Sequence, residues 1–279
     1  MDHQEFLEKG KPRGEAESGT VRDGVGMGRI LSREAAEVEK CAGLDKLKVG
    51  IIGISPGSGA SFLAGCLARY LANTKKHSPA VAELGKGALF DSFGMDKRFA
   101  GRSWFRFYLA LADNRSIRGK QNMDEGINWI LRSPWEEKVS LSFEQKLRLT
   151  GHAAGDVILC DFSGAEDSDF QLLRSMDQII GVIDPMPSKM LAGYQTLCAL
   201  KAMEAEGTDI TYVISKMNKG VNRRQMLDFL RLRNPVFLPL VELQSIYTAE
   251  YNCKIPYTLG AVKNALRAPL EEIASALAF

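Results

Sequence analysis

The sequence lacks a long apolar run, a leader-like beginning and a strong excess of charge. No apolar stretch approaches the roughly 18 residues that cross a bilayer, and the first five residues contain no apolar core of a signal peptide. The net charge is only +2, whereas chains that bind nucleic acid mainly through charge are usually far more basic. These absences predict a cytoplasmic protein without a transmembrane segment, whose contact with membranes would at most be peripheral.

Cysteine is scarce and scattered. The chain has five cysteines, an odd number, and no two of them stand at the spacing of metal ligands. Three lie in apolar segments, where cysteine acts as a small hydrophobic residue. The pattern favours a reducing compartment and predicts no metal site built on cysteine.

The chain changes character near residue 46. Residues 1–45 are rich in Gly, Glu, Arg and Lys and poor in large apolar side chains, which predicts a flexible lead-in. Apolar runs that predict strands follow at 48–54, 80–84, 127–131, 156–162, 178–183, 210–215 and 236–240. Segments that predict helices lie at 61–72, 142–152, 188–204, 223–231, 246–251, 260–267 and 269–277.

Alternation of wholly apolar strands with helices is typical of a parallel sheet covered on both faces. We therefore predict that residues 46–279 form one α/β domain with a doubly wound, mostly parallel sheet. In such sheets ligands bind beyond the carboxyl ends of the strands, so functional residues are sought directly after each strand.

The first predicted strand runs into a glycine-containing loop, and a helix follows the loop. Its residues are Gly57, Ser58, Gly59, Ala60 and Ser61, preceded by S-P. Glycines let successive N–H groups converge on an anion, and the helix N-terminus adds a positive dipole end. The hydroxyl at the last position is where a P-loop Ser/Thr contacts Mg²⁺. The loop therefore predicts a phosphate or nucleotide site.

The loop departs from the P-loop pattern G-x-x-x-x-G-K-[ST] at two positions. Ala60 replaces the lysine that contacts the β- and γ-phosphates, and Ile54 replaces the first glycine. Glycine turns after the first strand also occur in α/β folds without any ligand. A tight turn that binds nothing therefore stays open as an alternative.

A second reading of the same loop is a nicotinamide-dinucleotide site. Gly53, Gly57 and Gly59 spell G-x-x-x-G-x-G, as in short-chain dehydrogenases, and Glu83 could accept a ribose hydroxyl. Tyr212 and Lys216 stand at Y-x-x-x-K spacing. That pair should lie on a helix in such enzymes, whereas the sequence here predicts a strand.

Several segments resemble the MinD/ParA family of P-loop ATPases, in its CpaE-like branch, from about residue 46 to residue 279. The loop S-P-G-S-G-A-S-F-L-A resembles the family's S-P-K-G-G-V-G-K-T-T-L-A, and residues 156–164, D-V-I-L-C-D-F-S-G, resemble D-Y-V-I-I-D-T-P-A-G. Residues 184–188 resemble the family's T-x-P segment. Residues 239–242 and 249–256 resemble its I-P-x-D…A-x-x-x-G-x-P close. Order and spacing together carry the resemblance.

The resemblance implies binding of ATP or ADP with Mg²⁺. Ser61 and Asp161 would address the metal, Asp161 would also lie near the attacking water, and Glu83 would replace the strand-two aspartate as a second catalytic carboxylate. Ser215 takes the place of the family's adenine-reading asparagine. The residues expected to contact the nucleotide are Gly57, Ser58, Gly59, Ala60, Ser61, Phe62, Ser215, Pro239 and Val241.

Two lysines of the family are missing. The signature lysine, which in the family reaches the phosphates of a dimer partner, aligns with Ser55 or Pro56, and the ordinary loop lysine aligns with Ala60. Phosphoryl transfer depends on positive charge placed around the γ-phosphate. We therefore expect weak or absent hydrolysis and a regulatory or positioning scaffold, with the homodimer as the family habit. An interaction protein that keeps the fold but binds no nucleotide is the alternative.

Residues 97–120 interleave basic and aromatic side chains. Such a stretch can bind nucleic acid or another anionic surface, and ParA relatives bind DNA nonspecifically through a basic surface. The alternative is an amphipathic helix around residues 104–111 whose aromatic side chains point inward. The last segment, residues 269–279, is acidic on its polar side, which favours docking on the core over binding to lipid.

Overall fold

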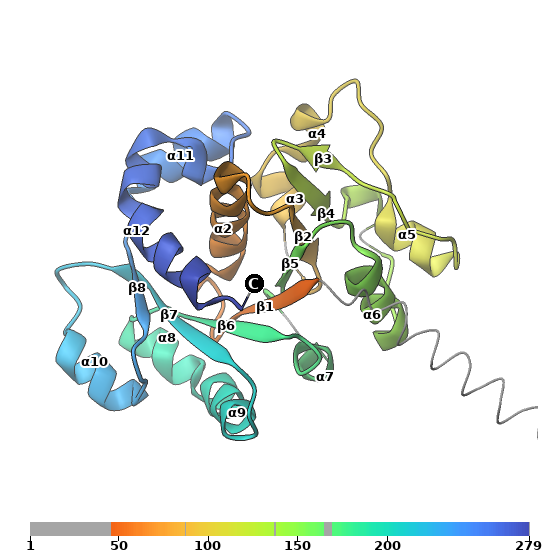
Figure 1. Cartoon of the computed structure of the whole chain (residues 1–279). Coiled ribbons are helices and arrows are strands. Elements are labelled where there is room, and N and C mark those ends of the chain that lie inside the picture. Colours follow the sequence, from red (N-terminus) through yellow and green to blue (C-terminus); the bar gives the residue numbers. More distant parts are fainter. Residues whose placement is uncertain (1–45, 87, 137, 165–168, 279) are drawn as a thin grey trace, which may run out of the picture. The chain divides into compact units, whose positions relative to one another are not determined.

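The computed structural model describes residues 46–279 with the exception of 87, 137, 165–168 and 279 (Figure 1). The predicted lead-in, residues 1–45, lies outside the described residues. Among the helices that are described, none is long and apolar enough to cross a membrane.

A single sheet runs through the described domain. Its order is β3-β4-β2-β5-β1-β6-β7-β8, and every neighbouring pair is parallel except β3 with β4. The strands are β1 (Leu47–Gly53), β2 (Pro79–Glu83), β3 (Met123–Asp124), β4 (Ile127–Ile130), β5 (Val157–Asp161), β6 (Gln178–Ile183), β7 (Ile210–Met217) and β8 (Val236–Pro239). This confirms the predicted α/β class and the mostly parallel sheet.

The strand order fixes what surrounds the glycine loop. β1 lies between β5 and β6, and β5 separates β1 from β2. Ile51 of β1 and Glu83 of β2 both pair in register with Asp161 of β5. In the dinucleotide-binding order 3-2-1-4-5-6 the first two strands are instead neighbours. The loop after β1 therefore lies beside the strand end that carries Asp161.

Helices cover both faces of the sheet (Figure 1). The α-helices are α2 (Ala60–Thr74), α3 (Leu89–Ser92), α4 (Met95–Arg98), α5 (Phe107–Ala112), α6 (Phe143–His152), α7 (Asp169–Leu173), α8 (Pro187–Ala192), α9 (Tyr194–Ala205), α10 (Arg223–Leu230), α11 (Leu243–Tyr251) and α12 (Gly260–Ala276). Two 3₁₀ turns, η1 (Pro134–Glu136) and η2 (Pro256–Thr258), complete the described elements.

Successive side chains of the strands pack into two separate hydrophobic cores, one on each face of the sheet. Val49 and Ile51 of β1 pack with α2 and α12, whereas Ile52 and the following Ile54 pack with α5, α8 and α9 on the other face. Side chains of a strand alternate between the faces of its sheet. Burial on both faces explains why these strands are apolar throughout, and it holds the carboxyl end of β1 rigidly in place.

Two helix predictions were wrong. The single helix expected at 188–204 is divided into α8 and α9 at Gly193, where an added Cβ would lie 2.6 Å from the carbonyl oxygen of Ile54. The two helices expected at 260–267 and 269–277 are one helix, α12, with Pro269 inside it. Leu266, Leu270 and Ile273 are buried along one face of α12, so packing on both sides of the proline outweighs the hydrogen bond that it removes.

Candidate phosphate-binding site

The loop between β1 and α2 has the backbone of an anion cradle. Gly57 and Gly59 have φ values of 77° and 97°, a left-handed region that side chains with a Cβ rarely adopt. Gly59 is the N-cap residue of α2, and no side chain caps the helix there. The first N–H groups of an α-helix have no partner inside the helix. They are therefore available to a bound anion, helped by the helix dipole.

Ser58 is turned inward beneath the loop. It is buried, its N–H donates to the carbonyl of Ser55 at 3.2 Å, and its hydroxyl oxygen would lie 2.0 Å from a Cβ placed on Gly53. Gly53 is therefore needed so that the loop can fold back onto β1. The hydroxyl of Ser215, near the end of β7, donates to the carbonyl oxygen of Ser58 at 2.7 Å and lies 3.1 Å from that of Ile183.

Two lysines brace the loop from outside. Lys216 Nζ donates to the carbonyl oxygen of Gly57 at 2.5 Å and to Asp184 Oδ2 at 2.7 Å. Lys189 Nζ, on α8, donates to the carbonyl oxygen of Pro56 at 3.1 Å. These bonds hold carbonyl oxygens of the loop and leave the N–H groups of Gly57 and Gly59 outside the two lysine contacts. These contacts between distant segments have no pattern in the sequence that reveals them.

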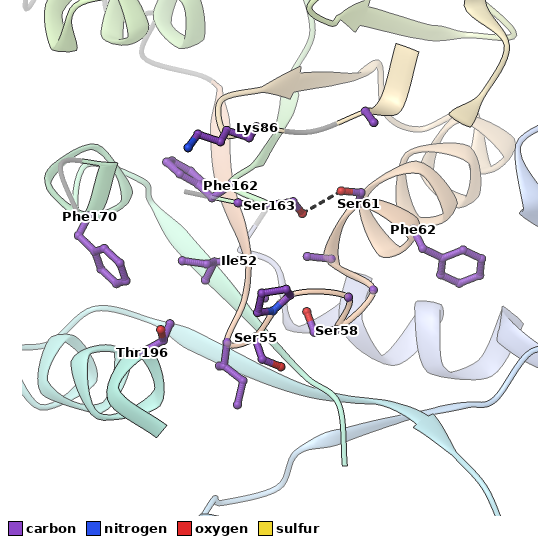
Figure 2. A pocket seen from close by; sticks show the side chains of 18 residues that line it. Ile52, Ser55, Ser58, Ser61, Phe62, Lys86, Phe162, Ser163, Phe170 and Thr196 are labelled. Atoms are coloured by element: carbon purple, nitrogen blue, oxygen red, sulfur yellow. Dashed lines mark hydrogen bonds between the residues drawn. The ribbon is translucent and has the colours of Figure 1, made fainter. Parts of the chain in front are cut away.

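Ser61, Asp161 and Ser163 form a compact polar cluster at the start of α2. Ser61 Oγ donates to Asp161 Oδ2 at 2.7 Å. It also lies 2.8 Å from Ser163 Oγ, and this second contact can be seen in Figure 2. Ser163 donates to Asp161 Oδ1 through its N–H at 2.9 Å and its hydroxyl at 2.6 Å. The structure thus brings together Ser61 and Asp161, which the sequence predicts as metal residues. It adds Ser163, whose only sequence signal is its place just beyond a strand end.

Asp161 is fully buried. Burial raises the pKa of its carboxyl, because the charged form loses its hydration, and the hydrogen bonds from Ser163 and Ser61 act in the opposite direction. Burial of the charged Asp161 carboxylate therefore costs hydration free energy, and the carboxylate contacts Ser61 at the end of the loop. A costly buried charge of this kind is common at functional sites.

A cavity of about 520 Å³ lies against the loop (Figure 2). Its lining residues are 52–62, Lys86, Ala88, Phe162, Ser163, Gly164, Phe170 and Thr196. Ser55 Oγ is buried there and has no hydrogen-bond partner among the described residues. A buried polar atom without a partner usually marks a missing ligand or water. Together with the free N–H groups of the loop, it fits the oxygen atoms of a phosphate group.

The donor set also fits a magnesium ion held mainly by a nucleotide. Mg²⁺ prefers oxygen ligands, keeps several waters and is often held by one or two protein groups together with substrate phosphates. The Ser61 hydroxyl and the Asp161 carboxylate are such groups. In the described part of the chain, no group of three or more His, Cys, Asp or Glu residues is arranged to hold a metal by itself.

Glu83 joins three segments rather than lining the cavity. It is buried, and its two carboxylate oxygens accept the N–H groups of Leu89 at 2.9 Å and of Arg132 at 3.0 Å. Burial raises the pKa of Glu83 to about 7, and the nearby Asp161 carboxylate adds to the rise. The position anchors the segments after β2 and β4. The catalytic role expected from the sequence stays a prediction, to which this geometry adds nothing.

Replacing Glu83 with glutamine is expected to flatten the dependence of stability on pH. The pKa of Glu83 rises from 4.5 to about 7, so its contribution to folding is complete below about pH 4.5 and is lost as the pH rises through about 7. Between pH 5 and 8 the wild type should lose more unfolding free energy than Glu83→Gln, by roughly 2–3 kcal/mol. Urea unfolding at both pH values measures this difference. The exposed Glu144 offers a matched control, and equal pH slopes in Glu83→Gln and wild type would contradict the prediction.

Of the residues predicted to contact the nucleotide, Phe62 is among the lining residues of the cavity, whereas Ser215, Pro239 and Val241 are not. Ser215 is bound to the backbone of Ser58 and Ile183. Pro239 pairs with Met217 at the end of β8, and Val241 packs against the core that contains α2 and α12. Phe62 begins next to the loop, but its ring points away from the cavity (Figure 2) and packs on the same core. Their predicted contacts with a nucleotide stay predictions.

The geometry does not assemble the predicted dehydrogenase pair. Tyr212 lies in β7, and its hydroxyl donates to Glu204 of α9 at 3.1 Å. Lys216, at the end of the same strand, is bound instead to Asp184 and Gly57. With β5 between β1 and β2, the sheet order also differs from that of dinucleotide-binding folds.

The aromatic side chains of the stretch 97–120 are buried or half-buried, whereas most of its other residues are exposed. Phe107 and Tyr108 are buried on α5, which agrees with the amphipathic alternative. Arg98 and Arg102 both form ion pairs with Asp124 of the β3–β4 hairpin. Part of the positive charge is therefore neutralised within the domain, and the structure adds no support to binding of DNA by this stretch.

Comparison with solved structures identifies the fold. A ParA family ATPase from Chlorobium tepidum matches with a TM-score of 0.62 and 14% identity, over 81% of this chain and 96% of that one. A putative plasmid partition protein from Borrelia burgdorferi, bound to AMPPNP, matches with a TM-score of 0.63 and 16% identity, over 82% and 98%. The septum site-determining protein MinD from Pyrococcus horikoshii, complexed with Mg-ADP, gives 0.63 and 15%, over 81% and 96%.

These matches show that the chain has the MinD/ParA type of P-loop ATPase fold. They cover nearly the whole length of the solved proteins. At such low identity they establish the architecture and leave the activity to be argued from the site. No family model matches the sequence, and no curated protein matches it either.

Proposed function

We propose that this protein binds ATP or ADP with Mg²⁺ in the loop after β1, and that it hydrolyses ATP slowly or not at all. The hydrogen bond of 2.7 Å between Ser61 and Asp161, at the N-terminus of α2, carries the proposal. It places a hydroxyl and a carboxylate where Mg²⁺ and phosphate oxygens would meet the uncapped helix. The bound nucleotides of the Borrelia and Pyrococcus proteins, which share the fold, agree with it.

Slow hydrolysis follows from the charge that the loop lacks. The resemblance predicts one lysine at position 55 or 56 and another at position 60, and the chain has Ser55, Pro56 and Ala60 there. Transition-state stabilisation in phosphoryl transfer depends mainly on cations placed around the γ-phosphate. A protein that binds nucleotide without rapid turnover is suited to a regulatory or positioning role in the cytoplasm, as a monomer or as a homodimer that closes over the nucleotide.

Replacing Gly59 with arginine tests the site directly. The wild type is expected to bind a nonhydrolysable ATP analogue with Mg²⁺ at micromolar affinity, and the variant to lose this binding. Gly59 has φ 97°, so a side chain there strains the backbone of the cradle. Gly207, after α9, has φ 100° and open space around it, which makes Gly207→Arg a matched control for strain alone.

Isothermal titration calorimetry of the three proteins gives the answer. Retained binding in Gly59→Arg, with Gly207→Arg equal to wild type, would move the nucleotide to another part of the chain. Absence of heat and of any thermal shift with ATP, ADP and NAD(P)H in the wild type would exclude the proposed function altogether.

An interaction protein without nucleotide is the second candidate, and α11 is the observation that favours it. Leu243, Tyr247 and Tyr251 are 62%, 55% and 85% exposed and follow one another at intervals of four residues on this helix. Residues four apart lie on the same face of a helix. An exposed apolar stripe of this kind is a common site of contact with other proteins. Capture of a partner that is unaffected by added nucleotide would favour this candidate.

A further inference from the structure

The cavity beside the loop has one charged side chain among the lining residues that the structure describes, and it is a cation. Lys86 lies in the segment between β2 and α3 and lines the cavity with Ser163 and Gly164, across from the loop (Figure 2). The other lining residues are apolar, hydroxyl-bearing or glycine. A cavity with uncapped N–H groups on one side and an ammonium group on the other is complementary to an anion.

The backbone just before Lys86 is packed against the end of β5, and the Lys86 side chain lines the cavity. The N–H groups of Leu84 and Gly85 donate to the carbonyl oxygen of Asp161 at 2.8 and 3.1 Å. A Cβ on Gly85 would lie 2.1 Å from the carbonyl oxygen of Ser163, so only glycine allows this approach. The segment before Lys86 is therefore held against the end of β5, next to Asp161, which is predicted to address the metal.

A second glycine makes room for the lysine stem itself. Gly164 has φ 69°, and a Cβ added to it would lie 3.2 Å from Cβ of Lys86. Gly85, which follows β2, and Gly164, which follows β5, thus allow the close packing that positions the side chain of Lys86. Placement of this kind is stronger evidence than exposure alone, because an ordinary surface lysine needs no such accommodation.

The two lysines that brace the loop have a different role. Lys189 and Lys216 donate to carbonyl oxygens of the loop, and Lys216 also pairs with Asp184. Neither lines the cavity. Lys86 lines the cavity from the side of β2 and β5. Ser163, which belongs to the cluster formed with Ser61 and Asp161, lines the cavity as well.

We propose that Lys86 binds the phosphate groups of the nucleotide and supplies the positive charge that Ala60 cannot provide. This inference rests on the proposed function, since it assigns a residue of the same site. A lysine on a flexible stem is well suited to contact phosphate as a point charge. Because it approaches from another strand end, it stabilises bound phosphate without restoring the geometry that speeds hydrolysis.

Substitution of Lys86 is expected to weaken phosphate binding while leaving contacts to the nucleoside intact. Lys86→Gln should bind Mg-ADP and Mg-AMPPNP about 10-fold more weakly or worse, the usual effect of losing a hydrogen bond to a charged group. Lys86→Arg, which keeps the charge, should stay within about threefold of wild type. Lys97→Gln, on exposed α4, serves as the matched control. Isothermal titration measures the affinity of all three variants for Mg-ADP, Mg-AMPPNP, magnesium triphosphate and adenosine.

Each outcome decides the inference. Weaker binding of all three phosphate ligands by Lys86→Gln, unchanged binding of adenosine and rescue by arginine would support it. Wild-type affinity in Lys86→Gln, while Gly59→Arg binds nothing, would overturn the role of Lys86 and leave the proposed function standing. Absence of binding in the wild type to every nucleotide and to triphosphate would overturn both. Thermal unfolding of Lys86→Gln and Lys86→Arg checks that each variant is folded.

Discussion

Replacing Ala60 with lysine is expected to tighten the binding of Mg-ATP by about 10- to 100-fold, since a hydrogen bond to a charged group contributes about 1.5–3 kcal/mol. Ala60 is the first residue of α2 and lines the cavity. A lysine here would place its ammonium group over the uncapped helix N-terminus, where a bound phosphate would neutralise it. Affinity for adenosine alone should not change.

Ala60→Gln is the matched control, because glutamine has similar length and no charge. Titration with a nonhydrolysable ATP analogue at two salt concentrations separates the effects, since a gain from charge weakens as salt rises. ATP turnover is expected to stay low, because the position of the signature lysine still holds Ser55 or Pro56. Equal affinities of the lysine and glutamine variants would contradict a phosphate cradle at this loop.

The same substitution connects the loop to Lys86. If two cations contact the same phosphates, the cost of Lys86→Gln should be smaller in the Ala60→Lys background than in wild type. A double-mutant cycle measures this coupling, which is expected to be large for groups that share one partner. Independent effects of the two substitutions would place them on different parts of the ligand.

The sheet and the loop could be predicted because the sequence encodes them locally. Strands that are mostly apolar, such as residues 178–183, are buried on both faces. A short apolar run of this kind in the sequence predicts a buried strand. The glycines at positions 57 and 59 mark a backbone conformation that other residues avoid. Asp161 could be paired with Ser61 in advance because residues 156–164 resemble the corresponding MinD/ParA segment, and the structure joins the two side chains by a hydrogen bond.

The errors and omissions depend on contacts between segments far apart in the chain. Gly193 divides a helix because it approaches the carbonyl of Ile54, and Pro269 fails to divide one because leucines on either side are buried. Lys86 gains its place from Gly85 and Gly164, which pack against residues after another strand. A pattern of spacing along one segment contains none of this information.

Asp161→Asn is expected to weaken nucleotide binding and to keep or raise stability at neutral pH. Asp161 accepts a hydrogen bond from Ser61, and we propose that both address Mg²⁺; removal of a group that orients a metal ligand typically lowers metal affinity by about 10- to 100-fold. The Mg²⁺-dependent part of nucleotide affinity should fall by a similar factor, and affinity in the presence of EDTA should not change.

The stability of this variant should move in the opposite direction because the wild-type charge is unfavourable. Burial raises the pKa of Asp161 above 3.8, so the group favours folding at low pH and loses that contribution as the pH rises through its folded pKa. Asparagine carries no charge and can still accept from Ser163, so the variant should gain stability relative to wild type as the pH rises through the folded pKa of Asp161. Asp156→Asn, at the other end of β5, removes a half-exposed carboxylate without touching the loop, and it should leave the Mg²⁺-dependent part of nucleotide affinity at the wild-type value. Weaker Mg²⁺-dependent binding together with equal or higher stability is the signature of a residue kept for function, whereas a loss of stability with unchanged binding would assign Asp161 to the fold alone.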